Sequence, residues 1–416
     1  MPKHAPECSV IIPVYNKWEL TRDCLASLHE HGAAHDLEVI VVDNASSDAT
    51  ASELVPFGES LFGERFTPII FPENRNFGPA CNAGARAATA PLLFFLNNDT
   101  ILTPGWFPPL RDALRENDSL GAVGPLLLFG DGSVQHLGVT FGAIGPCHLY
   151  KHFPADHPVV AKKRDLQCLT GAAFMIRPDL FADCGGFYEG YRNGCEDLEL
   201  CVHVRRRGKK LRCVADAKIF HLESQTPGRK DKDGEDHNFS LFMERCGGDV
   251  YTDAHHHALR DGFSVFINDF LDISFRLQEK DEQALAAEAA GRDEAYWLHV
   301  CGKHPLWVKG REILAHGMEQ AGKQALAIRF LAELADIEPM RNRYHDLLRL
   351  VPFAEKDASW PKTAEERLHI MARFFDSKAY VLSRIQKYRD RFRPGGDPFL
   401  EQAFDAKLQE MFPARR

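Results

Sequence analysis

Short apolar runs alternate with amphipathic stretches along the first part of the chain. The runs "CSVIIPV" (8–14) and "LEVIVVD" (37–43) are rich in Val and Ile and lack polar alternation, which is typical of strands buried on both faces of a parallel sheet. Between them, residues 16–32 carry apolar side chains near every third or fourth position and end at Gly32, which predicts a helix. The series continues as strand, helix and strand over residues 66–71, 79–88 and 91–97. We therefore expect an α/β domain with a twisted, mostly parallel sheet.

The pattern changes twice beyond this region. From about 120 to 222, Gly-rich segments with short strands predominate, and residues 196–208 predict one helix, so this part is expected to be a mixed α+β half. Beyond about 250 strand signals fade, and segments rich in Ala, Leu, Glu and Arg predict an all-α C-terminal domain over 251–416. Within it, residues 314–339 have the spacing of a tetratricopeptide helix pair, which makes a tetratricopeptide-like domain one candidate.

Composition narrows the class of protein. An apolar share of 44% with 26% charged residues is that of a soluble globular protein, and the net charge of −9 disfavours nucleic acid as a partner. Eleven cysteines without a CxxC pair indicate reduced thiols. The first residues lack a long apolar region, and no run reaches about 18 apolar residues, so we expect neither export nor a membrane span but a cytoplasmic protein.

Polar residues follow each of the four strands predicted in the first half. Because ligands of open α/β sheets bind at the carboxyl ends of strands, these residues predict a polar rim around one site. Each segment alone is explained as a turn or helix cap, whereas four together favour a binding site. The segments are "PVYN" (13–16), "DNASSDAT" (43–50), "ENRNFGPACNAG" (73–84) and "NNDT" (97–100).

The residue types on this rim suit a nucleotide. GxGxxG and GxxxxGK[ST] are missing from the sequence of this half, which disfavours a dinucleotide or P-loop site. Amides and carboxylates pair well with a nucleobase and ribose. No Walker-type lysine follows a strand, so Mg²⁺ or Mn²⁺ held by Asp99 is the natural partner of a pyrophosphate.

Seven segments in this order resemble the family 2 inverting glycosyltransferases with the GT-A fold, especially rhamnosyltransferase-like members that build bacterial surface glycans. The resemblance covers about residues 8–228 and implies a glycosyltransferase domain over 1–250, with a nucleotide-binding half at about 8–118 and an acceptor half at about 119–228. The segments are "VIIPVYNKWEL", "VIVVDNASSDAT", "ENRNFGPACNAG", "LLFFLNNDTIL", "LTGAAFMIRPDLFADCGGFYEGY", "CEDLELCVHVRRRG" and "HLES".

The resemblance also assigns the donor side of the site. Asn97, Asn98 and Asp99 occupy the place of the family's DXD motif, with Asp99 as the carboxylate for Mn²⁺ or Mg²⁺ and Asn97 in place of the first Asp. His221 matches a histidine that many GT-A enzymes place on the metal or diphosphate. Contacts to the nucleotide sugar are implied for Pro13, Tyr15, Asp43, Asn44, Ser46, Asn74, Asn82, Asn97, Asn98 and Asp99.

On the acceptor side, Glu196 and Asp197 fall where the family has its ED pair, and Asp197 is implied as the general base. The attacking hydroxyl must lose a proton, which a positioned carboxylate can accept. The pair is equally suited to a helix start, where negative charge is favourable. Weaker assignments near the acceptor or diphosphate are Gln135, His136, Gly171 and Ser224.

We therefore expect a metal-dependent glycosyltransferase that uses a UDP-, dTDP- or GDP-linked sugar. Its acceptor would be a glycan, lipid-linked glycan or protein, in the synthesis of an O-antigen, a capsule or a glycoprotein. The helical C-terminal domain would bind a protein or the inner face of the membrane. Two alternatives are open: a degenerate domain acting as a scaffold, and a sugar-nucleotide pyrophosphorylase, although the latter has a glycine-rich basic loop where this chain has "PVYNKWEL".

The three consecutive histidines at 255–257 belong to none of these assignments. We expect them to begin a solvated helix, with adventitious metal binding as the alternative.

Overall fold

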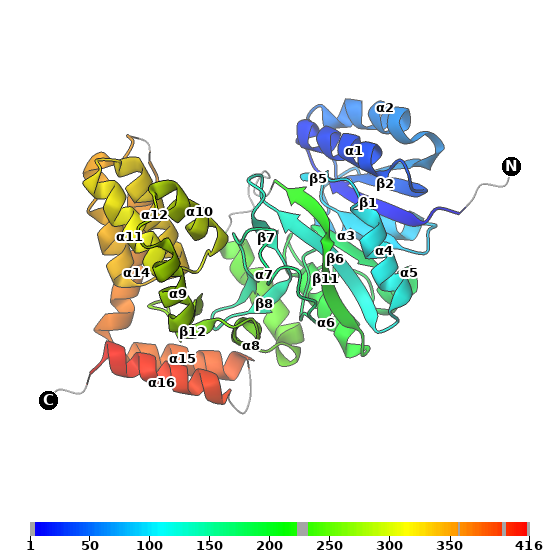
Figure 1. Ribbon diagram of the computed structural model, residues 1–416. Helices are drawn as coiled ribbons and strands as arrows, with labels where there is room; N and C mark the ends of the chain where they lie inside the picture. The colour runs from blue at the N-terminus through cyan, green and yellow to red at the C-terminus, as the bar shows by residue number, and fades with distance from the viewer. Residues whose placement is uncertain (1–4, 223–231, 357, 393–396, 414–416) are drawn as a thin grey trace. The chain divides into compact units, whose positions relative to one another are not determined.

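The computed structural model describes residues 5–222, 232–356, 358–392 and 397–413. The chain divides into two compact units, one of residues 1–140 with 148–250 and the other of residues 141–147 with 251–416. Figure 1 shows the first unit mainly in blue to green and the second in yellow-green to red.

A mixed nine-stranded sheet forms the centre of the first unit. Four parallel strands lie in the spatial order β3 (Phe66–Ile70), β2 (Leu37–Asp43), β1 (Cys8–Val14) and β4 (Leu93–Leu96). Next to β4, the order continues with β10 (Ala173–Ile176), β6 (Leu120–Leu128), β11 (Lys210–His221) and β5 (Thr100–Leu102), and β7 (Val134–His136) pairs with β6. β10 is antiparallel to both its neighbours, and β11 is parallel to β6 but antiparallel to β5. The predicted parallel half followed by a mixed half is thus confirmed. Two short strands, β8 (Val139–Phe141) and β9 (Pro146–His148), lie between β7 and β10 in the chain.

The register of the parallel strands brings their carboxyl ends to one edge. Val14 at the end of β1 lies opposite Asp43 at the end of β2, which in turn lies opposite Ile70 at the end of β3. The segments that follow these strands must therefore emerge side by side, as expected for an open α/β sheet.

Seven α-helices accompany the sheet in the described part of the first unit, and α1 (Trp18–Gly32), α3 (Phe77–Ala87) and α6 (Glu196–Arg206) lie where the amphipathic pattern predicts helices. Trp106, Phe94 and Leu25 have no exposed surface, and they belong to one core that spans most of the sheet. Helix α1 packs on α2 and β5, α3 on β1 and β2, and α4 on β6 and β11. The helices are α1 (Trp18–Gly32), α2 (Thr50–Phe62), α3 (Phe77–Ala87), α4 (Phe107–Glu116), α5 (Pro178–Asp183), α6 (Glu196–Arg206) and α7 (Lys232–Cys246).

Two strands of the mixed half are longer than the Gly-rich sequence predicts, with nine residues in β6 and twelve in β11. The glycines of β6 serve close packing rather than turns. A Cβ on Gly124 would lie 3.1 Å from the carbonyl oxygen of Ala173 in β10, and one on Gly121 would lie 2.5 Å from Val204 of α6. The prediction of short strands was wrong here because a glycine required by a neighbour resembles a turn glycine in sequence.

The second unit begins with α8 (Ala254–Arg260) and a two-stranded hairpin, β12 (Ser264–Ile267) and β13 (Ile273–Arg276). From there on the described elements are helices, which confirms the predicted helical C-terminal region, although the hairpin corrects the expectation that all of residues 251–416 would be helical. A tetratricopeptide repeat is still a prediction. Each of α11 to α14 packs on the next helix in the chain. The helices are α9 (Glu279–Ala289), α10 (Glu294–Lys303), α11 (Val308–Gln320), α12 (Gln324–Ile337), α13 (Arg341–Leu348), α14 (Trp360–Asp376), α15 (Lys378–Phe392) and α16 (Pro398–Met411).

Among the described residues, none of the helices combines the length and apolar character needed to cross a membrane.

The contact between α3 and β1 leaves no room for a side chain at Gly84, where a Cβ would lie 2.4 Å from Cγ2 of the buried Ile11. We expect Gly84→Val to lower the free energy of unfolding by about 1–3 kcal/mol, because overpacking forces the helix away from the strand. Urea unfolding of the full chain measures this. Gly130→Val is the control: its Cβ meets nothing within 4 Å, so a change of no more than about 0.5 kcal/mol is expected. Equal effects of the two variants would contradict the explanation.

Candidate functional site

Side chains tie the ends of β1 and β2 together. The backbone N–H of Asn16 donates to Oγ of Ser46 at 2.7 Å, and the N–H of Ser46 donates to Oδ1 of Asp43 at 2.9 Å. In return, Oδ1 of Asn16 accepts from the N–H of Ser47 at 2.7 Å. Asp43 is buried, with 2% of its surface exposed. Asn16, which the sequence analysis did not single out, therefore fixes the shape of the rim.

A second asparagine fastens the segment after β3 to the end of β2. Buried Asn44 accepts the N–H of Arg75 at 2.7 Å through Oδ1 and donates through Nδ2 to the carbonyl of Asn76 at 3.0 Å. Asn74 is exposed, and its Oδ1 accepts the N–H of Asn76 at 2.9 Å. The predicted donor-binding residues of β2 and β3 thus lie in one connected loop cluster.

The other predicted donor contacts differ in exposure. Tyr15 is 42% exposed, and Pro13 is partly buried at the end of β1. Asn82 instead joins α3 to the segment after α5. Its Nδ2 donates to the carbonyl of Phe187 at 2.8 Å and to Glu189 at 3.0 Å, and its Oδ1 accepts the N–H of Phe187 at 2.9 Å. A contact between Asn82 and a nucleotide stays a prediction.

Backbone strain is concentrated around the same segments. Six of the nine non-glycine residues with positive φ in the described chain lie in or next to the segments named here, and such strain clusters at binding and catalytic sites. They are Asn16 (55°), Lys17 (62°), Ala45 (64°), Asn76 (68°), Asn193 (56°) and Cys195 (74°).

The segment after β4 meets the end of β11. Antiparallel pairing of β5 with β11 places His221 opposite Thr100. As a result, Nε2 of His221 lies 3.1 Å from Oδ1 of Asp99 and 3.5 Å from Nδ2 of Asn97. Asp99 and His221 are each 6% exposed. The structure therefore brings together the two residues predicted to hold a metal, which lie more than a hundred positions apart in the sequence.

Gln135 determines which nitrogen of His221 carries the proton. Nε2 of Gln135 donates to the backbone carbonyl of His221 at 3.0 Å, so its Oε1 is the atom that faces Nδ1 of His221 at 2.7 Å. Nδ1 must then be the donor, which leaves Nε2 to direct a lone pair, or a second proton, at Asp99. A cation between a lone pair and a carboxylate oxygen is favourable, and such support of a metal-binding histidine is usual. The residues present therefore fit a divalent cation.

Asn98, the remaining residue of the Asn97–Asn98–Asp99 motif, bonds to helix α1 rather than to His221. Nδ2 of Asn98 donates to Oγ1 of Thr21 in α1 at 2.9 Å, so Asn98 anchors the segment to a helix. Nearby, Sγ of Cys24 lies 3.6 Å from the carbonyl of Asn97, and burial, together with the charge of Asp99, raises the pKa of this thiol to about 12. Cys24 is therefore a protonated structural thiol.

The predicted base lies at the start of α6. Oδ2 of Asp197 accepts the N–H of Gly171 at 2.7 Å, and its Oδ1 accepts the N–H of Leu198 at 2.8 Å. A Cβ on Gly171 would lie 3.2 Å from Cβ of Asp197, so this close approach favours glycine. Glu196 is 5% exposed, and its Oε2 accepts the N–H of Gly194 at 2.6 Å. Asp197 is thus held rigidly, and each of its oxygens can accept a further hydrogen bond.

The segment just before β10 connects this base to the pair formed by Asp99 and His221. The N–H of Asn97 donates to the carbonyl of Ala172 at 2.8 Å, one residue after the glycine that binds Asp197. On the other side, the N–H of Thr170 donates to Nε2 of His136 at 3.4 Å, and Nδ1 of His136 lies 2.8 Å from Nδ1 of His148. Burial, with the nearby histidines, lowers the pKa of His136 well below its usual value, so its ring is neutral. Gln135 thus contacts His221, and His136 contacts Thr170 next to Gly171, whereas Ser224 lies outside the described residues.

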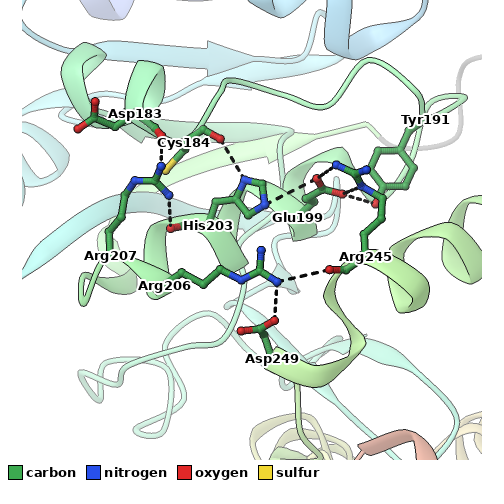
Figure 2. A network of polar contacts seen from close by, with 9 residues as sticks. All are labelled: Asp183, Cys184, Tyr191, Glu199, His203, Arg206, Arg207, Arg245 and Asp249. Atoms are coloured by element: carbon green, nitrogen blue, oxygen red, sulfur yellow. Dashed lines mark hydrogen bonds and ion pairs between the residues drawn. The ribbon is translucent and has the colours of Figure 1, made fainter.

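A partly buried charged network that no sequence motif indicated holds α6 (Figure 2). The carboxylate of Glu199 accepts two hydrogen bonds from Arg245 of α7, at 2.8 and 2.7 Å, and one from the hydroxyl of Tyr191 at 2.7 Å. The guanidinium of Arg245 also lies 3.6 Å from the ring centroid of Tyr188. One signal was present: Glu199 is the third acidic residue of "EDLEL", among apolar neighbours.

Two other groups in the described chain could hold a metal: Glu199 with His203 and Cys246, and His255 with His256 and Asp397. In the first, Glu199 is already bound to an arginine, and burial raises the pKa of the Cys246 thiol to about 11. A thiol that holds its proton is a poor ligand, so the first group is structural.

Comparison with known proteins identifies the family that the first unit resembles. Residues 9–185 match the protein-family model described as "Glycosyl transferase family 2". The "O-antigen biosynthesis protein RfbC" of Myxococcus xanthus is 27% identical over 299 residues, which are 69% of this chain and 22% of that protein. The "N-acetylglucosaminyl-diphospho-decaprenol L-rhamnosyltransferase" of Mycobacterium tuberculosis is 24% identical over 46% of this chain and 69% of its own length. The chain spans about a quarter of the length of the curated relatives that it matches first.

Among solved structures, the "Mannosyltransferase PcManGT from Pyrobaculum calidifontis in complex with GDP-Man and Mn2+" aligns with 91% of this chain and 89% of its own. The TM-score is 0.40 and the identity 19%, too weak a likeness to support any inference about ligands.

The Glu199 network makes a prediction about stability. We expect Glu199→Gln to lower the free energy of unfolding at neutral pH by about 2 kcal/mol, since a charged hydrogen-bonded pair is lost although Arg245 is partly screened by solvent. Asp249→Asn is the matched control, because its ion pair with Arg206 is 2.6 Å long but exposed on both sides. A change below about 1 kcal/mol is expected for it.

The same variant should show a defined pH dependence. Burial acts to raise the pKa of Glu199, but hydrogen bonds from Arg245 and Tyr191 hold it below the ordinary value of 4.5. The stabilisation is therefore complete above pH 4.5 and is lost as the pH falls through the folded-state pKa. The difference between wild type and Glu199→Gln in urea unfolding should shrink in acid; a constant difference would contradict this.

Proposed function

We propose that this chain transfers a sugar from a nucleotide-diphosphate donor to an acceptor hydroxyl with inversion at the anomeric carbon. The match of residues 9–185 to the model of glycosyl transferase family 2 supports this proposal. The observation that carries the proposal is the connection through the two residues that precede β10. The carbonyl of Ala172 accepts from Asn97, beside the Asp99–His221 pair, and the N–H of Gly171 donates to Asp197. A site for the leaving diphosphate and a base for the acceptor would then share one edge of the sheet.

The donor would lie along the rim formed by the ends of β1, β2 and β3. The exposed ring of Tyr15 can stack on a base, and Asp43 can accept from ribose hydroxyls. Asn44, Ser46 and Asn74 hold the loops in shape, as their hydrogen bonds indicate. The nucleotide would be UDP, dTDP or GDP.

Asp99 and His221 would hold Mn²⁺ or Mg²⁺. The ion would supply positive charge that stabilises the departing diphosphate. Gln135 keeps Nε2 of His221 directed at Asp99, so the ligand atoms are oriented in advance. Because Asn97 replaces a second carboxylate, the site has less negative charge, and a moderate metal affinity is expected.

Asp197 would act as the general base. As the acceptor oxygen forms its bond to the anomeric carbon, the bond from that carbon to the diphosphate breaks, and the hydroxyl proton passes to the carboxylate of Asp197. Hydrogen bonds from Gly171 and Leu198 hold this carboxylate in place, so it needs no reorientation during the reaction. Glu196 would help to form the turn that precedes the base.

The names of the relatives support a role in bacterial surface glycans, such as an O-antigen, with a glycan, a lipid-linked glycan or a protein as acceptor. In this proposal residues 1–250 form the catalytic domain, with halves at about 8–118 and 119–228. Residues 251–416 form a helical domain that binds a protein or the inner face of the membrane. A scaffold without activity is the alternative, and Asn97 is the feature that favours it.

A variant that lacks the proposed base, Asp197, distinguishes an active glycosyltransferase from a scaffold without activity. We expect Asp197→Asn to reduce turnover by a factor of about 10²–10⁴, with little change in the KM for the donor, because the base acts only in the chemical step. Release of nucleoside diphosphate from a panel of UDP-, dTDP- and GDP-sugars with Mn²⁺ measures turnover. The exposed Asp216→Asn is the control and should match wild type. Absence of turnover by wild type with every donor would favour the scaffold.

Loss of the metal ligand should have a different signature. We expect wild type to gain thermal stability from a nucleoside diphosphate plus Mn²⁺, since ligands of the native state stabilise it. In Asp99→Asn the part of this gain that depends on Mn²⁺ should disappear, while the part due to nucleotide alone remains. Thermal unfolding with and without EDTA measures both parts. A Mn²⁺-dependent gain that survives in Asp99→Asn would contradict the assignment of Asp99.

A further inference from the structure

The three histidines at the start of α8 are not solvated as a group. His255 has no exposed surface and His257 is 6% exposed, whereas His256 is 41% exposed at its side chain. The expectation of a solvated helix start was therefore wrong for two of the three, because His255 packs on the first turn of α16 and His257 faces Asp253. The ring of His255 stacks on Phe399 of α16, with centroids 5.6 Å apart and planes 11° from parallel.

Two of these histidines converge on one carboxylate oxygen. Nε2 of His255 lies 3.0 Å from Oδ2 of Asp397, and Nε2 of His256 lies 3.3 Å from the same atom. The other oxygen of Asp397 caps α16 by accepting the N–H of Phe399 at 3.1 Å. Residues 142 positions apart in the sequence therefore meet through atoms of the kinds that bind transition metals.

The spacing of these atoms fits a tetrahedral ion. Ligands bound to Zn²⁺ at its usual bond lengths lie about 3.3–3.5 Å from one another. The two nitrogen–oxygen distances are 3.0 and 3.3 Å, and all three ligand atoms lie within 4.8 Å of one another. Because the side chain of His256 is 41% exposed, its ring is free to rotate slightly. Such a rotation would bring its Nε2 to an ion held by His255 and Asp397, and one side of the ion would remain open to solvent.

The charge states and surroundings suit a cation. Burial, with the charge of His256, lowers the pKa of His255 to about 4, so its ring is neutral at neutral pH. Burial acts to raise the pKa of Asp397, but His255 and the N–H of Phe399 hold it below its usual value. A second carboxylate lies close by: Asp253 is 3.6 Å from His257 and accepts the N–H of Phe141 at 2.8 Å. The negative charges of Asp397 and Asp253 therefore both act on His255.

We propose that His255, His256 and Asp397 form a zinc site, with water as the fourth ligand. Two imidazoles and one carboxylate favour Zn²⁺ over Mg²⁺ or Mn²⁺, which prefer all-oxygen sites. The ion fastens α8 to the first turn of α16, and so stabilises the second unit rather than taking part in sugar transfer. It is separate from the Asp99–His221 pair, and the proposal does not depend on the proposed function.

Zinc binding to the full chain tests this site. The background variant is Asp99→Asn, which removes the other candidate metal ligand. After treatment with EDTA and its removal, titration calorimetry with Zn²⁺ alone should show one site per chain. Changes outside the direct ligands weaken metal sites by about 10- to 100-fold, so His256→Ala, in the same background, should weaken binding at least tenfold.

Two comparisons keep the test decisive. The exposed His299→Ala, also in the second unit, should bind zinc like the background variant. Because the exposed His256 contributes little to packing, His256→Ala should unfold at the temperature of the metal-free background and gain nothing from zinc. The proposal is wrong if the background variant binds no zinc, or if His256→Ala and Asp397→Asn bind it as tightly as the background does.

Discussion

The candidate site depends on the position of β10 between β4 and β6. This strand is antiparallel to both neighbours and joins the parallel half of the sheet to the mixed half. The two residues just before it make two different backbone hydrogen bonds. The carbonyl of Ala172 accepts from Asn97, and the N–H of Gly171 donates to Asp197. Moving β10 by one residue would reverse the direction of its side chains and separate the two sets of polar residues.

Buried charge in the first unit is matched at each place by fixed hydrogen bonds. Asp43 is bound by the N–H of Ser46, Glu196 by the N–H of Gly194, and Glu199 by an arginine and a tyrosine. A buried carboxylate is costly unless it is paired, so these partners determine which acidic residues the interior accepts. Asp99 differs from them because the partner at its Oδ1 is an imidazole whose Nδ1 is already committed. That difference marks Asp99 as the carboxylate suited to a cation.

The two units use histidine in different ways. In the first, Gln135 orients His221 toward a carboxylate near the polar rim, where a cation would meet a diphosphate. In the second, His255 and His256 of α8 meet Asp397 at the start of α16. An ion bound there would hold the two helices together. Imidazole serves both purposes, and its surroundings decide which one applies.

The sequence by itself determined the parallel strands, their helices, the polar strand ends and the candidates Asp99, Asp197 and His221. The strands, helices, polar strand ends and Asp99 follow from hydrophobic periodicity and turn residues, which are properties of neighbouring positions, whereas Asp197 and His221 are implied by the resemblance of the motifs to a known family. Only the tertiary structure decided the length of β6, the clamp on Glu199 and the burial of His255. It also revealed that Gln135 orients His221, because these two residues lie 86 positions apart in the sequence. Such contacts depend on which strands and helices become neighbours, and local sequence patterns do not predict that.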